Sequence, residues 1–185
     1  MSFELECMAI DMPYVADHPN REGFRGVLTL LDVTSDQAPS GSRGHRVVLL
    51  RRAAEAALPS LLGMALDYSP RLDRHDAQRK IGVITRADVV GRQLEVGGFL
   101  YAKDFPEIVR DIARSGGRPR PGLGRDVRAS PYGDSSALGM SFEIAGGVVA
   151  DMRAKVWTLT QAVFTGAAVL RRDKAAYRET WIELE

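Results

Sequence analysis

The residues of this chain best suited to chemistry are a serine and a histidine that lie far apart in the sequence. Ser141 stands inside the apolar, strand-like run Leu138–Ile144, and His75 lies just before the apolar run Ile81–Thr85. A serine hydroxyl is a weak nucleophile until a neighbouring base removes its proton, and that base needs an acceptor to orient it. A serine on a strand and a histidine in a loop would supply two parts of such a system.

Only three histidines compete for the role of base. His18 lies in a polar, turn-like segment and is expected at the surface, and His45 opens a predicted strand. His75 precedes a strand, so a loop can carry its imidazole to the rim of a sheet, and it is the preferred base. Ser141 lacks the Gly-x-Ser-x-Gly context of the α/β-hydrolase elbow, which argues against that fold.

The composition is that of one ordinary globular domain. The chain has 185 residues, 45% of them hydrophobic and 26% charged, with a net charge of +1, so neither disorder nor a strongly basic nucleic-acid-binding protein is indicated. Cys7 is the single cysteine, which excludes an intramolecular disulfide and a cysteine-based metal cluster. The histidines lack paired ligand spacing, and we expect no metal and no cofactor. No apolar run approaches the roughly 18 residues of a membrane helix, so no membrane association is expected.

Apolar and polar residues alternate over many short segments, which predicts a mainly β fold with peripheral helices in a single domain, residues 1–185. A hairpin is expected around Asp88–Gly91, an alanine-rich helix over Arg51–Ala57, and a helix beginning at Asp104 with a possible capping carboxylate. Residues 118–136 are rich in Arg, Pro, Gly and Ser and predict a mobile loop ahead of Ser141. Many strands with few helices favour a closed or nearly closed β-barrel.

Four short motifs occur in an order that resembles the tailed-phage prohead protease family, which is related in fold to herpesvirus assemblin. They are His75-Asp76, the Ile81-Gly82-Val83 start of a strand, the glycine-led strand Gly91–Leu100, and Met140-Ser141-Phe142-Glu143-Ile144. The resemblance covers roughly residues 24–170. Each motif alone is short and degenerate, and their shared order carries the similarity.

The resemblance implies a serine endopeptidase in which Ser141 is the nucleophile and His75 the general base. The family commonly has Glu or His at the third position, on the next long strand, where this chain has Gln161. A neutral amide can orient an imidazole but stabilises imidazolium less than a carboxylate does. Three interpretations stay open: Gln161 is a weaker orienting residue, Glu143 or Asp76 supplies the carboxylate, or the chain is a catalytically silent homologue that acts as a capsid assembly component.

The same resemblance implies the biological setting. The substrate would be a scaffold protein or the major capsid protein precursor, cleaved in the host cytoplasm inside the assembling prohead, with a homo-oligomer possible and no nucleic-acid partner. Arg171 and Arg172 would be candidates for an oxyanion donor or a water anchor, the alternative being an ordinary basic start of a helix.

Overall fold

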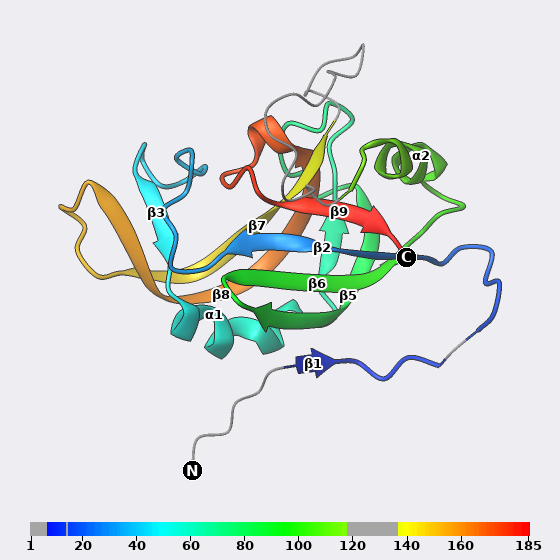
Figure 1. Cartoon of the computed structure of the whole chain (residues 1–185), viewed down its shortest axis with the longest axis horizontal. Helices are drawn as coiled ribbons and strands as arrows, with labels where there is room; N and C mark the ends of the chain where they lie inside the picture. The colour runs from blue at the N-terminus through cyan, green and yellow to red at the C-terminus, as the bar shows by residue number, and fades with distance from the viewer. Residues whose placement is uncertain (1–6, 14, 118–136) are drawn as a thin grey trace.

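The computed structural model describes residues 7–13, 15–117 and 137–185 (Figure 1). The described part of the chain is mainly β, with short helices at its periphery, as the sequence predicts. The strands are β1 (Cys7–Ala9), β2 (Glu22–Leu30), β3 (Arg46–Leu49), β4 (Ala65–Asp67), β5 (Lys80–Val90), β6 (Gln93–Leu100), β7 (Leu138–Val149), β8 (Val156–Arg171) and β9 (Trp181–Leu184). The helices are α1 (Arg51–Ala57), α2 (Pro106–Arg114) and the 3₁₀ turns η1 (Leu58–Leu61) and η3 (Arg172–Lys174).

All nine strands belong to one sheet, ordered β3-β8-β4-β5-β6-β2-β9, with β7 paired to β8 and β1 paired to β5. The sheet is open and curls into a half-barrel, so the prediction of a closed or nearly closed barrel of the prohead protease and assemblin type is wrong. Among the described strands no ladder joins β7 to β9, the two ends of the curl. The Met140 N–H instead donates to the Thr180 side-chain oxygen at 3.2 Å, so this backbone donor of β7 is paired with a side chain and not with a neighbouring strand.

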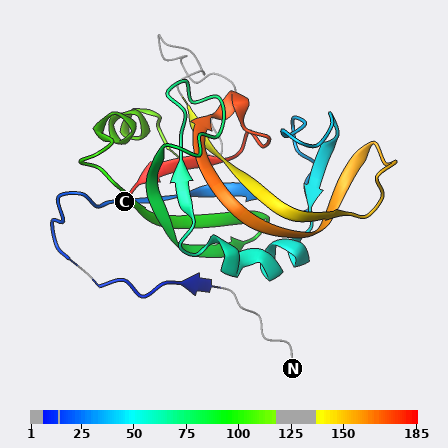
Figure 2. The same ribbon diagram turned by 180° about the vertical axis from the view of Figure 1, so that it is seen from behind.

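The inside of the curl holds the main hydrophobic core. Phe24, Ile84, Leu100 and Phe164, from four different strands, are all fully buried or nearly so. Burying each such side chain contributes roughly 1.5–3 kcal/mol. Helix α1 and the adjoining η1 cover one end of β8 (Figure 2). The small side chains of α1 allow this close approach, and the helix predicted over Arg51–Ala57 is confirmed with these bounds.

Two local predictions meet different outcomes. The hairpin between β5 and β6 is confirmed, and it turns at Gly91, whose φ of +58° favours glycine. The helix predicted to begin at Asp104 instead begins at Pro106, with Phe105 at the N-cap and no side-chain cap. The Asp104 carboxylate accepts a hydrogen bond from Asn20 Nδ2 at 2.8 Å and so is used to hold the N-terminal segment. The loop predicted over 118–136 lies outside the described residues.

The longest elements are β7 and β8, which form a curved hairpin that extends beyond the rest of the sheet (Figures 1 and 2). They pair antiparallel over nearly the whole length of β7, with register shifts after Glu143, Ala145 and Val148. The other edge of β8 pairs in parallel with β3 near its start and with β4 near its end. Strand β8 therefore joins the segment that carries Ser141 to segments from the first half of the chain. No helix in the described ranges has the length and apolar character needed to cross a membrane.

Candidate active site

The pairing of three strands places Ser141 and Asp67 at the same level of the sheet. Ala168 of β8 is the partner of Ser141 on the β7 side and of Asp67 on the β4 side. Partners in adjacent strands present their side chains on the same face, and strands lie about 4.8 Å apart, so the two Cα atoms are separated by roughly 10 Å. A single imidazole can occupy a gap of this size.

The imidazole of His75 contacts the Asp67 carboxylate. His75 Nδ1 lies 3.5 Å from Asp67 Oδ2, long for a hydrogen bond but typical of catalytic pairs that tighten when substrate binds. Asp67 is fully buried. Its Oδ1 accepts the Asp76 backbone N–H at 3.0 Å, and its Oδ2 lies 3.3 Å from the Lys80 ammonium. The carboxylate is therefore held from both sides while it faces the histidine.

The loop that carries His75 is anchored to the sheet. The backbone N–H of Arg171, at the end of β8, donates to the Leu72 carbonyl at 2.7 Å. Within the loop, the Ser69 hydroxyl donates to the Asp73 carboxylate at 2.9 Å. These bonds fix the loop beside the strand that also pairs with Ser141, so the position of His75 is set by the same element as the position of the serine.

The environment of Asp67 favours its ionised form. Burial acts to raise the pKa of this carboxyl, but the contact with His75, the Asp76 N–H and the positive charge of Lys80 outweigh it, and the pKa lies below the ordinary value of 3.8. Asp67 is therefore charged at neutral pH. A charged carboxylate beside Nδ1 is the kind of group that orients an imidazole next to a serine.

The lowered pKa of Asp67 predicts how stability depends on pH. A carboxyl whose pKa is depressed by folding contributes stability that is fully present above its unfolded value, near 3.8, and that is lost as pH falls through the folded value. The free energy of unfolding, measured in urea, should therefore differ more between wild type and Asp67→Asn at pH 6 than at pH 3. A difference that is the same at both pH values would contradict this account of the carboxylate.

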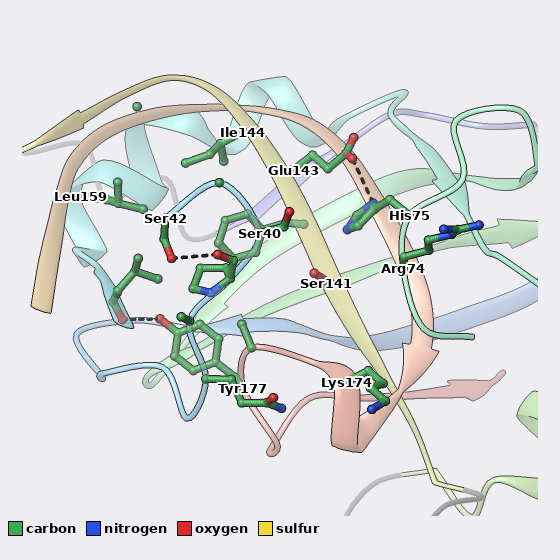
Figure 3. Close-up of a pocket in the computed structure, with 18 of the residues that line it drawn as sticks. Ser40, Ser42, Arg74, His75, Ser141, Glu143, Ile144, Leu159, Lys174 and Tyr177 are labelled. Atoms are coloured by element: carbon green, nitrogen blue, oxygen red, sulfur yellow. Dashed lines mark hydrogen bonds and ion pairs between the residues drawn. The ribbon is translucent and has the colours of Figure 1, made fainter. Parts of the chain in front are cut away.

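Ser141 and His75 line the same cavity, which has a volume of about 800 Å³ (Figure 3). This is the size of a pocket for a substantial ligand, within the range of about 300–1,000 Å³. Both ring nitrogens of His75 are buried and neither has a hydrogen-bond partner among the described residues, so no hydrogen bond joins His75 to Ser141. In the view of Figure 3 the imidazole lies between Glu143 and Ser141.

Glu143 is a second carboxylate at the same imidazole. It lies two residues after Ser141, on the same face of β7, with Oε1 at 3.7 Å from His75 Nδ1. Its side chain is 49% exposed, whereas that of Asp67 is 1% exposed. Because solvent screens an exposed carboxylate, Asp67 is the stronger orienting group. Glu143 was one of the alternatives open from the sequence, and the structure brings it to the histidine.

The structure does not bring Gln161 to His75. Gln161 is exposed and pairs with Val148, seven residues along β8 from Ala168, the partner of Ser141. At about 3.3 Å per residue this is roughly 23 Å from the serine, so Asp67 and not Gln161 is the residue that lies beside His75. Asp76 supplies its backbone N–H to Asp67, and its carboxylate lies 3.8 Å from the Arg79 guanidinium.

The two arginines proposed for the oxyanion do not line the cavity. Arg171 Nε lies 3.3 Å from the Asp173 carboxylate. The Arg172 guanidinium donates to three backbone carbonyls, those of Gly117, Leu138 and Thr180, at 3.0–3.3 Å. Arg172 thus ties the start of β7 to the segment before β9, which is a structural role. The remaining histidines are also accounted for: His18 Nδ1 accepts the Asn20 N–H, and His45 stacks on Trp157.

Sequence reasoning missed Asp67 because an acidic residue directly after an apolar run usually begins a loop in solvent. Asp67 is in fact the last residue of β4 and has neighbours on both sides, Lys80 of β5 and Ala168 of β8. The available signal was an acid directly after an apolar run and eight residues before the histidine. The signal is weak, because charges usually follow a strand where the chain returns to solvent.

Comparison with known proteins finds no family model that matches the chain and no curated protein with significant sequence similarity. The described residues contain no group of three or more His, Cys, Asp or Glu side chains that could hold a metal ion.

Proposed function

We propose that the protein is a serine endopeptidase with Ser141 as nucleophile, His75 as general base and Asp67 as the residue that orients the base. The observation that carries the proposal is the buried, ionised Asp67 in contact with His75 at the cavity that Ser141 lines. A buried carboxylate facing a histidine beside a serine is the arrangement that hydroxyl activation requires.

The reaction follows from these roles. The Ser141 oxygen attacks the carbonyl carbon of the peptide bond as His75 accepts the hydroxyl proton, and the carbon–nitrogen bond breaks as His75 returns that proton to the departing amine. Water, deprotonated by the same imidazole, then attacks the acyl-enzyme and releases the second product with Ser141 restored. Asp67 stabilises the imidazolium in both stages.

We propose a scaffold protein or the major capsid protein precursor as the substrate, cleaved during tailed-phage head maturation. This assignment is supported by the order of the four sequence motifs that resemble the prohead proteases, and by a serine and histidine that share a cavity. The setting that goes with it is the interior of the assembling prohead in the host cytoplasm.

One observation favours a second candidate, the catalytically silent capsid component. Two carboxylates lie near the same nitrogen of His75, and Ser141 makes no hydrogen bond to the imidazole among the described residues. In this alternative the site is a remnant, and the cavity binds a capsid protein without cleaving it.

Co-expression with the cognate capsid precursor, followed by intact-mass analysis, separates the two. Cleavage at a defined bond, together with labelling of Ser141 by a fluorophosphonate located by peptide mass, would support the endopeptidase. An intact precursor and an unlabelled Ser141 in folded protein would rule out the endopeptidase and leave the silent component.

A further inference from the structure

The cavity has two chemically different ends. Ser141, His75 and Glu143 lie at one end, and the other end is mainly apolar. Its apolar walls come from β3, β7, β8 and the segment before β9, namely Val47, Ile144, Val149, Trp157, Leu159 and Tyr177. Ser42 of the loop before β3 also lines this end (Figure 3), and its hydroxyl lies 2.7 Å from the Pro39 carbonyl and 2.6 Å from the His45 carbonyl. The register shift after Glu143 contributes to this arrangement, because a bulge changes the alternation of a strand and lets consecutive side chains face the same space. One strand thus supplies both Ser141 and part of the apolar wall.

The apolar walls are fixed before any ligand arrives. The Trp157 indole donates to the Met152 carbonyl at 3.3 Å and stacks on His45 with ring centroids 4.5 Å apart. The Tyr177 hydroxyl donates to the carbonyls of Val33 and Val47, each at 3.2 Å. Burial raises the pKa of Tyr177 to about 12, so the hydroxyl remains a donor. A preformed wall lowers the entropic cost of binding a side chain.

Gly147 keeps the apolar end open. A Cβ at this position would lie 3.3 Å from Ile144 Cδ1 and 3.8 Å from Leu159 Cδ2, both in the cavity wall. The backbone of Gly147 is outside the left-handed region that favours glycine. A side chain is therefore compatible with the backbone here, and it would fill the cavity next to two of its apolar residues.

We propose that the apolar end is a specificity pocket for one large apolar side chain, leucine-, methionine- or phenylalanine-like, of an extended protein substrate near the cleaved bond, and that Gly147 sets the size of this pocket. The inference rests on the proposed function, since it takes Ser141 to be the residue that attacks. The pocket defines the class of substrate as a polypeptide with a bulky apolar residue close to the cleavage site. A charged substrate side chain would lose its hydration in this pocket without gaining an oppositely charged partner.

Binding is measured on Ser141→Ala protein, so that the result does not depend on turnover. The probes are the N-acetyl methylamides of phenylalanine, leucine, alanine and glutamate, titrated against the ¹⁵N-labelled protein while the Trp157 indole N–H signal is followed. The phenylalanine and leucine probes should bind about ten-fold more tightly than the alanine and glutamate probes, because they bury more apolar area.

Adding Gly147→Val to the Ser141→Ala protein should lower its affinity for the phenylalanine and leucine probes by about ten-fold, because the new side chain occupies the pocket. The affinity for the alanine probe should remain nearly unchanged. Ala145→Val is the matched control, since Ala145 is an exposed residue of β7 outside the cavity lining. Equal binding of all four probes, or equal effects of the two valine variants, would overturn the pocket. If the protein binds the apolar probes more tightly but the wild-type protein cleaves nothing, the specificity pocket is supported and the proposed endopeptidase activity is contradicted. If the wild-type protein cleaves the precursor but shows no preference for the apolar probes, the activity is supported and the pocket is contradicted.

Discussion

Ser141→Ala is expected to lower kcat for cleavage of the capsid precursor by about 10⁶-fold, which corresponds to roughly 8 kcal/mol of transition-state stabilisation. The effect is this large because Ser141 forms the acyl-enzyme in the proposed route, and the remaining groups act as a unit that depends on the serine. Ser141 is only partly buried, so the loss of one oxygen should leave the fold intact. The measurement is single-turnover cleavage followed by intact mass, with the thermal unfolding midpoint as the test of folding.

Ser40→Ala is the matched control for this experiment. Ser40 lines the same cavity but belongs to the exposed loop between β2 and β3. Its replacement should change kcat by less than about three-fold, as for most exposed substitutions. Retained cleavage in Ser141→Ala, or a loss in Ser40→Ala as large as that in Ser141→Ala, would remove Ser141 from the role of nucleophile.

Local features of the fold could be predicted from the sequence because neighbouring residues determine them. Helix α1 and the β5–β6 hairpin each follow from a short pattern and a turn signal. The closure of the sheet depends instead on whether β7 and β9 exchange backbone hydrogen bonds, which no local pattern encodes. The same holds for the length of β8, which continues to Arg171 because β4 and β7 pair with its last residues.

The candidate site could likewise be predicted from the sequence only in part. Ser141 and His75 were predicted, and the structure places both at one cavity. The third position was not predicted, because a residue orients a histidine through its place in space, and that place is set by strand pairing across about 100 residues of sequence. Gln161, Glu143 and Asp76 were the candidates from the sequence, and Asp67 was not among them; the register at Ala168 brings Asp67 to the level of Ser141.

Asp67→Asn is expected to lower kcat by about 10⁴-fold with little change in KM, the size of effect found when the orienting carboxylate of a serine protease loses its charge. The amide retains the size of the side chain and an oxygen for the Asp76 N–H, but it no longer stabilises the imidazolium that forms as Ser141 attacks. Peptide hydrolysis at neutral pH provides both parameters, and the urea unfolding described above shows whether the variant is folded.

Two controls separate this role from simple loss of stability. Gln161→Ala lies on the same long strand, far from His75, and should retain wild-type kcat, while Glu143→Gln removes the exposed carboxylate at the same nitrogen and should lower kcat by less than about ten-fold. Lys80→Met removes the ammonium 3.3 Å from Asp67 Oδ2. This substitution should lower the free energy of unfolding and leave kcat closer to the wild-type value than Asp67→Asn does. If Glu143→Gln instead lowers kcat by as much as Asp67→Asn, the imidazole is oriented by both carboxylates, and the assignment of Asp67 alone fails. If Gln161→Ala is the most damaging of the four, the triad inferred from the strand register is wrong.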